Sequence, residues 1–279
     1  MTNGDAPPDF HFFTKIDDRK AELTRQHETT RQSKEFQDQV RYLRRITRDF
    51  LKSTQICWFA ATRYKPFVDN SLVFRSIDDL NQSVVALQTL IEEGMLTPAH
   101  REMRYILESS IKNLFVDQKA PTRNFEEKVM FLHEQVPRSS ISVVDDLYMP
   151  FDDELKTTFI ADIKGIYSRA CAYVHPSKIQ VDERVSLASI DVYIGFERPK
   201  DLERINKELF RLYEATLVLV FSALDRSSLG DIFIQWLDDE QNWRFHKGKY
   251  IKAISSIFDY KMERKERKTI NKSNSGNAA

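Results

Sequence analysis

The hydrophobic pattern of the chain has the period of an α-helix over most of its length. Apolar residues recur every three or four positions, and short polar segments separate the stretches that share this spacing. The pattern predicts helices over residues 14–59, 71–95, 97–116, 124–135, 152–174 and 200–224, with one or two more inside 232–260. From 185 to 197 the apolar residues alternate only in part, so a short strand or an ordered loop is expected there.

Two of these helical stretches have extreme patterns. Ala215–Leu224 is the longest apolar run, and it is too short to span a bilayer, so it predicts a fully buried helix at the centre of the fold. Between Asp17 and Glu35, in contrast, Leu23 is the only large apolar residue. A helix this polar buries little by itself, so it either frays or packs on a partner, and we expect a homodimer or a larger assembly.

The composition supports an all-α fold. The chain has 279 residues, of which only 7 are glycine and 9 are proline, whereas average usage would give roughly twenty and fourteen. So few helix breakers favour long helices over a many-turned β-fold. We therefore expect a single-domain helical bundle over residues 13–260, preceded by a flexible arm (1–12) and followed by a basic disordered tail (261–279).

Residue spacing excludes several classes of function. Neighbouring glycines lie at least 18 residues apart, which rules out glycine-rich phosphate loops and the nucleophile elbow of hydrolases. Cys57 and Cys171 are too few for a disulfide framework or a thiolate zinc site. None of the six histidines has another at i+3 or i+4, so neither a metal nor another cofactor is expected. Met1–Phe12 lacks the pattern of a secretory signal, and a cytoplasmic protein without membrane contact is expected.

One helix face concentrates positive charge in a chain whose 42 basic and 42 acidic residues otherwise cancel. At 100° per residue, five cations fall within an arc of about 100°, and an apolar stripe lies on the opposite side of the helix. The five cations are Arg41, Arg44, Arg45, Arg48 and Lys52. This basic stripe is either a solvated helix face or a contact surface for an anion such as the RNA backbone.

The segment Tyr167–Ser177 carries the strongest candidate chemistry. A continuous helix would place Arg169 and His175 about 120° apart, but His175 precedes a proline, which predicts that the helix ends near Val174. His175 can then turn back toward Arg169 or face another chain, or simply cap the helix end. A histidine that acts on the 2′-hydroxyl proton and an arginine that stabilises charge on the phosphate suit metal-free RNA cleavage.

The same segment matches a family signature. Arg169–His175 fits the R-x(4–6)-H pattern of the HEPN superfamily of helical ribonucleases and toxins. The chain resembles bacterial HEPN-like proteins in which a helix of the type R-x-x-x-E-S-x-I-x-x-L-F precedes a tyrosine-and-histidine segment. Arg104–Phe115 fits that helix, and Tyr173–Ser177 fits the segment that follows it. The resemblance covers about residues 71–224 as an ordered set of helices.

The resemblance implies a homodimer in which two such motifs share one cleft, and a metal-independent endoribonuclease that leaves a 2′,3′-cyclic phosphate. It also implies a role in toxin, phage-defence or stress systems, with an antitoxin or defence protein as partner. Arg104, Glu108 and Tyr173 would support the catalytic pair; alternatively, Arg104 and Glu108 form only an intrahelical ion pair. Ala170, where many active members have a polar residue, and the neutral net charge favour a second function, a catalytically silent HEPN-like module that senses or binds a partner.

Overall fold

The computed structural model describes residues 10–174, 177–188, 198–237 and 242–258, and all regular structure within these ranges is helical. The all-α fold is therefore confirmed. The helices are α1 (Phe10–Gln32), α2 (Lys34–Ala61), α3 (Lys65–Asn70), α4 (Leu72–Arg75), α5 (Ile77–Glu92), α6 (Leu96–Lys119), α7 (Phe125–Gln135), η1 (Ser142–Asp146), α8 (Asp153–Cys171), α9 (Lys178–Ala188), α10 (Pro199–Ser222), α11 (Arg226–Ile232), η2 (Phe233–Leu237), η3 (Arg244–Lys247) and α12 (Lys249–Ser256).

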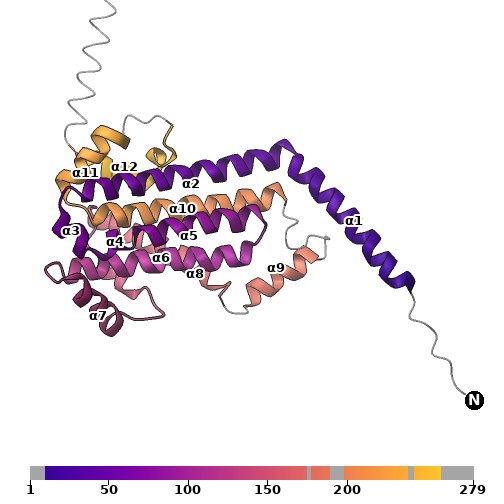
Figure 1. The fold of residues 1–279 in the computed structure, drawn as a ribbon, viewed down its shortest axis with the longest axis horizontal. Coiled ribbons are helices and arrows are strands. Elements are labelled where there is room, and N and C mark those ends of the chain that lie inside the picture. Colours follow the sequence, from indigo (N-terminus) through magenta and orange to yellow (C-terminus); the bar gives the residue numbers. More distant parts are fainter. Residues whose placement is uncertain (1–9, 175–176, 189–197, 238–241, 259–279) are drawn as a thin grey trace, which may run out of the picture.

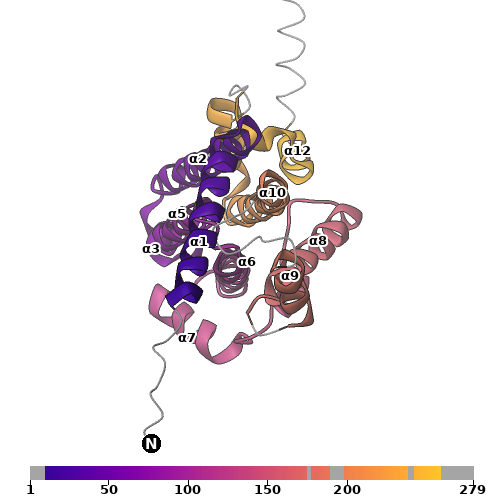
Figure 2. The same ribbon diagram turned by 90° about the vertical axis from the view of Figure 1, so that its right-hand side faces the viewer.

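Four long helices form the body of the bundle. Figure 1 shows α2, α10, α5 and α6 running side by side, whereas α1 extends away from them at an angle. Seen end-on, α10 lies in the middle, with α2 and α12 on one side and α6 and α8 on the other (Figure 2). The most polar predicted helix thus lies outside the bundle, and the most apolar one lies inside it.

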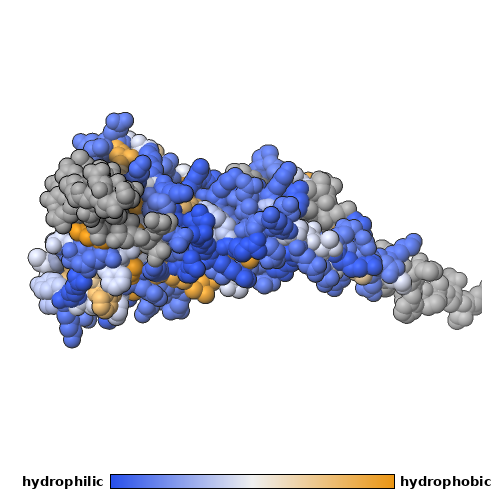
Figure 3. Space-filling view, turned by 90° about the horizontal axis from the view of Figure 1, so that it is seen from above, coloured by the Kyte–Doolittle hydropathy of each residue, from blue (hydrophilic) through white to orange (hydrophobic). Residues whose placement is uncertain are grey.

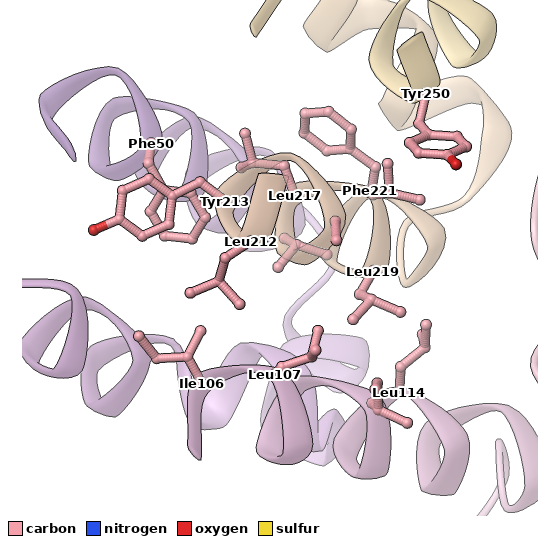
Figure 4. Close-up of a cluster of buried hydrophobic side chains, with 14 of the residues drawn as sticks. Phe50, Ile106, Leu107, Leu114, Leu212, Tyr213, Leu217, Leu219, Phe221 and Tyr250 are labelled. Carbon is pink, nitrogen blue, oxygen red and sulfur yellow. The ribbon is translucent and has the colours of Figure 1, made fainter. Parts of the chain in front are cut away.

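The core is built around α10. Every residue from Leu212 to Phe221 is buried, which confirms the expectation for most of the apolar run 215–224. Its last three residues, 222–224, are half-buried, because α10 ends at Ser222. Leu212 and Leu219 point toward Ile106 and Leu107 of α6, and Phe50 of α2 covers the other side (Figure 4). Within the described ranges, no helix is both long enough and apolar enough to cross a membrane.

A buried ion pair fixes the short helices against α6. The Asp117 carboxylate accepts hydrogen bonds from the backbone N–H groups of Leu72 and Val73, at 2.9 and 3.0 Å, and from the Ser71 hydroxyl at 2.6 Å. Lys128 of α7 donates to the same carboxylate at 2.8 Å, and both charged side chains are buried. One aspartate therefore starts α4 and also holds α7 in place.

A second buried carboxylate holds the last helix. Glu214 of α10 accepts a hydrogen bond from the Tyr250 backbone N–H at 2.7 Å, which satisfies a free donor at the start of α12. Burial raises the pKa of the Glu214 carboxyl above its usual value, and these backbone hydrogen bonds only partly offset the shift. Gly248 gives this carboxylate the room it needs, because a Cβ at that position would lie 2.7 Å from Glu214 Cδ and 3.0 Å from the Phe245 carbonyl oxygen.

The structure differs from the sequence-based prediction at several helix boundaries. For the stretch 14–59, one very long helix or two are expected, and the structure has two, because the Ser33 backbone is extended and its hydroxyl caps α2 at the Phe36 N–H. Residues 185–188 continue helix α9, so a strand or loop does not begin at 185; this helix starts where Ser177 Oγ accepts a hydrogen bond from the Gln180 N–H. Residues 189–197, like the predicted arm and tail, lie outside the described ranges, except for 10–12 at the start of α1.

The contact between Gly248 and Glu214 generates a stability prediction. Gly248→Ala should lower the free energy of unfolding by about 1–3 kcal/mol, because the new methyl group overlaps the Glu214 carboxylate. Gly165→Ala is the matched control: the nearest atom to its added Cβ is 3.8 Å away, so alanine should stabilise α8 by roughly 0.5–1 kcal/mol. Urea unfolding monitored by circular dichroism measures both. Equal stability of the two variants would contradict the packing described here.

Candidate functional site

A polar face of α6 carries the residues that meet the end of α8. His100, Arg104, Glu108 and Lys112 recur every four residues, so they lie along one side of this helix. The adjoining side packs Met103, Ile106, Leu107 and Ile111 into the core. Along this row, His100 meets α10, Arg104 and Glu108 meet α8, and Lys112 lies toward the chain after α7. The apolar side of the helix fixes the position of the row.

Two predicted site residues, Arg104 and Glu108, meet Tyr167 of α8 in the middle of this row. Arg104 Nε lies 3.3 Å from Glu108 Oε2, so the intrahelical ion pair is present. The Tyr167 hydroxyl of α8 donates to the same Glu108 oxygen at 3.1 Å, and Arg104 Nε donates to the hydroxyl at 3.3 Å. Burial, assisted by Glu108, raises the pKa of Tyr167 to about 12, although Arg104 opposes the shift. Tyr167 is thus a proton donor that joins α8 to the ion pair.

A pocket opens beyond Glu108. Its volume is about 620 Å³, and it lies between α4, α5, α6 and α7, with Leu219 and Val220 of α10 among its lining residues. Lys112 stands at this pocket and donates hydrogen bonds to Glu108 and, at 2.7 Å, to the Arg138 carbonyl oxygen. Glu108 therefore belongs both to the contact with α8 and to the pocket wall.

The first turn of α6 holds the chain just before the predicted catalytic histidine. The His100 ring stacks on the Tyr173 ring, with centroids 3.9 Å apart, and Arg101 Nε donates to the Tyr173 carbonyl oxygen at 2.9 Å. On the other side, the Ser177 hydroxyl donates to the Ala172 carbonyl oxygen at 2.7 Å. His175 itself lies outside the described residues, but the residues on both sides of it are anchored.

Arg169 lies on the exposed side of the last turn of α8, near a carboxylate that no sequence pattern singles out. Glu208 of α10 lies 3.2 Å from His100 Nε2. Burial of the Glu208 carboxyl alone would raise its pKa, but the His100 hydrogen bond and the positive charges of Arg169 and Arg204 outweigh this effect. The pKa of Glu208 is consequently lowered, and this carboxylate is the nearby counter-charge for Arg169.

The side chains of the basic stripe of α2 have polar partners on the surface. Its arginines all have polar partners: Arg41 with Asp38, Arg44 with Glu92, Arg45 with the Asn242 carbonyl oxygen, and Arg48 with Asp49. The bond from Arg44 lowers the pKa of Glu92, with burial opposing it. Lys52 is exposed on the same side of the helix. The predicted spacing therefore gives a row of cations that are exposed apart from the half-buried Arg45, with Asp38, Glu92 and Asp49 as acidic neighbours.

These arrangements define what the site can do chemically. The α6–α8 contact brings Arg104, Glu108 and Tyr167 together, and it places Arg169 and Tyr173 around the neighbouring His100–Glu208 pair. The predicted RNA-binding residues lie on α2, apart from this contact. Among the described residues, no three His, Cys, Asp or Glu side chains form a group suited to a metal ion.

Sequence reasoning missed His100, Lys112 and Glu208. A signal for the first two was available, since they extend the Arg104–Glu108 spacing by one step in each direction along α6. Glu208 had no such signal, because only the packing of α10 beside α6 brings it to His100. The residue spacing within one helix predicts which residues share a face of that helix. A residue that another helix brings to this face depends on tertiary packing.

Comparisons with known proteins give no further assignment. No family model matches the chain, no curated protein matches it, and no solved structure matches it. The candidate site therefore rests on its own geometry.

The lowered pKa of Glu208 predicts an acid-dependent stability. Glu208→Gln should cost about 1–3 kcal/mol of unfolding free energy near pH 6, where the carboxylate makes a charge-assisted hydrogen bond to His100. A carboxyl whose pKa is depressed in the folded state stabilises above its ordinary value of 4.5 and loses this contribution as the pH falls through the folded value. The difference between variant and wild type should therefore shrink below pH 4.5.

Thermal unfolding at pH 6 and at pH 3.5 measures this dependence. Glu203→Gln, on the exposed side of the same helix, is the control and should stay close to wild type at both values. A Glu208→Gln deficit that is independent of pH would show that the pair contributes through packing and not through charge.

Proposed function

We propose that the protein is a metal-independent endoribonuclease of HEPN type in which Arg169 and His175 are the catalytic residues. The supporting observation is the anchoring of the α8 end. Tyr173 is stacked on His100 and bonded to Arg101, while Arg169 lies close enough to Glu208 to lower its pKa. The arginine and the segment that contains His175 thus border the same His100–Glu208 pair.

The proposed reaction needs only a base and a charge stabiliser. His175 accepts the proton of a ribose 2′-hydroxyl, and the 2′-oxygen attacks the adjacent phosphorus. The bond to the 5′-oxygen of the next nucleotide breaks, which leaves a 2′,3′-cyclic phosphate and, after protonation, a 5′-hydroxyl. Arg169 stabilises the additional negative charge on the phosphate in the transition state.

Arg104, Glu108 and Tyr173 act as positioning residues in this proposal. Arg104 and Glu108 hold the Tyr167 hydroxyl and with it the end of α8. Tyr173 holds the chain that leads to His175 against α6. RNA would reach the site along the basic stripe of α2, and the biological setting would be a toxin, phage-defence or stress system, with an antitoxin or defence protein as partner.

One observation favours a second function, a catalytically silent HEPN-like module that senses or binds a partner. The Glu208 carboxylate lies near Arg169 and partly neutralises the charge that a phosphate would use. In this alternative, the α6–α8 contact is structural and the surface around Arg169 binds a protein.

We also propose a homodimer that forms through α1. None of the α1 side chains described is fully buried, and α1 extends away from the bundle (Figure 1). Its end is attached to the domain by the bond from Arg31 to the Glu92 carbonyl oxygen, at 2.6 Å. An isolated helix of this polarity is only marginally stable in water, so a second copy would supply the missing contacts.

The catalytic proposal predicts cleavage without metal. The purified protein should cleave mixed RNA in EDTA and leave 2′,3′-cyclic phosphate ends, which mass spectrometry identifies. Arg169→Ala and His175→Ala should each lower the rate at least about 100-fold, since each would remove a transition-state interaction. Arg123→Ala, on the surface of the loop before α7, is the matched control and should cleave as wild type does. A folded protein with no cleavage at all would favour the silent module.

The assembly proposal is tested by light scattering at micromolar concentration. The wild type should have twice the chain mass of 32.8 kDa. Leu23→Asp should shift it toward the monomer, because a carboxylate replaces the one large apolar side chain in the stretch 17–35. Ala21→Asp, an exposed position on the same helix, is the control and should leave the mass unchanged. A wild type that scatters as a monomer would contradict the proposal.

A further inference from the structure

The exposed ridge of α2 continues past the basic stripe and ends in aromatic side chains. Arg41, Arg48, Lys52 and Phe59 are spaced by seven, four and seven residues, which places all four within an arc of about 40°. Each is exposed in the structure. From Arg41 to Phe59 the helix rises about 27 Å, enough to follow several nucleotides.

Three large aromatic side chains at this end of α2 are exposed to solvent. Trp58 is 43% exposed, Phe59 is 59% exposed, and Tyr64, just after the helix, is 66% exposed. We call these three residues the aromatic patch; Phe59 continues the line of the ridge, and Trp58 lies about 100° around the helix from it. Large aromatic side chains left in water forgo part of the free energy of burial, and exposed apolar side chains that lie near one another mark interaction surfaces. Figure 3 views the molecule from above, on the side of α2, where most of the coloured surface is hydrophilic.

Cations surround the aromatic patch as well as the stripe. Arg63 and Lys65 flank Tyr64 in the sequence, and both are exposed. Arg63 makes a long contact to Asp231, at 3.4 Å. A surface that alternates cations with exposed aromatic rings has the chemistry of sites for single-stranded nucleic acid, where phosphates meet the cations and unpaired bases stack on the rings.

The acidic partners of the stripe do not oppose this use. Arg41 and Asp38 are both largely exposed, and Arg48 remains 71% exposed beside Asp49. An exposed ion pair such as that of Arg41 with Asp38 contributes little free energy, so a phosphate group can replace this carboxylate at low cost. Asp49 is buried and stays in place, but the Arg48 side chain beside it remains open to a phosphate. Arg44, which makes two bonds to Glu92, is the more strongly held member and lies toward α5.

We infer that this ridge binds single-stranded RNA, with the backbone along Arg41, Arg48 and Lys52 and with bases stacked on the aromatic patch. The inference rests on the proposed RNA-cleaving function and names its substrate as unpaired RNA. A duplex would contact the cations but could not stack its paired bases on the rings. Charge complementarity along the ridge favours RNA over a protein partner.

The binding test uses the His175→Ala protein, so that RNA stays intact, and a fluorescent 12-nucleotide oligouridine as the probe. Phe59→Ala with Tyr64→Ala should lower the affinity at least about tenfold, because each stacked base contributes roughly 5- to 150-fold, and should leave the salt dependence unchanged. Replacing Arg41, Arg48 and Lys52 by glutamine should instead reduce the salt slope by about 0.7 for each phosphate that no longer meets a cation. Tyr148→Ala, at a residue 73% exposed on another loop, is the matched control and should bind normally.

Trp58 provides a direct readout of stacking. In a Trp236→Phe background the remaining tryptophans are Trp58 and the buried Trp243, so quenching by oligouridine reports on Trp58. Quenching by the single strand and not by a matched RNA duplex would support the inference. Equal binding by the aromatic variant and by the His175→Ala protein without the aromatic substitutions would overturn the inference, and the aromatic patch would then be a protein contact. A third outcome separates the two proposals. If the aromatic variant loses binding and the wild-type protein does not cleave RNA, the binding site is supported and the nuclease function is rejected.

Discussion

The complete burial of the second half of α10 is the constraint on which the rest of the fold depends. A helix that is apolar on every side has to be enclosed on every side, and no single neighbour can do this. The chain meets the requirement with α2, α6, α8 and α12, which all pack against α10. Long neighbouring helices are needed to cover α10 along its length, and α2 and α6 are among the longest helices of the bundle. The positions of both candidate surfaces follow, because one lies on α2 and the other on α6.

Buried carboxylates give this apolar core its specific arrangement. Asp117 has four hydrogen-bond donors around it, and Glu214 accepts from the start of α12. Asp49 of α2 accepts from the Arg244 backbone N–H at 3.0 Å, and the nearby Ser53 hydroxyl accepts from the Trp243 indole at 2.9 Å. Apolar packing tolerates sliding of one helix over another, whereas a hydrogen bond between two named groups does not. Each carboxylate therefore fixes at least one short element that hydrophobic burial alone would leave free to shift.

The sequence was most informative where a signal was local. Asn124 caps α7, with Glu127 completing the capping box, so the predicted range 124–135 agrees closely with the helix. The sequence allows two helices in the stretch 14–59 but does not locate the break at Ser33, because the stretch contains neither proline nor glycine and a serine cap resembles any other serine in a polar run. In the candidate site, the pairing of Arg104 with Glu108 followed from helix spacing, whereas Tyr167 and Glu208 came to it from other helices. Local spacing fixes which residues share a face, and tertiary packing decides what that face meets.

The close approach of Gly248 to Glu214 has a consequence for how the chain can evolve. The two positions lie 34 residues apart in the sequence, yet the side chain at one occupies the space that a side chain at the other would need. A lineage can lose the glycine without penalty only after the glutamate has been replaced by a smaller residue, whereas the reverse order passes through a destabilised intermediate. The order of these substitutions is therefore constrained by epistasis, and a related chain that lacks the glycine is expected to lack the glutamate as well.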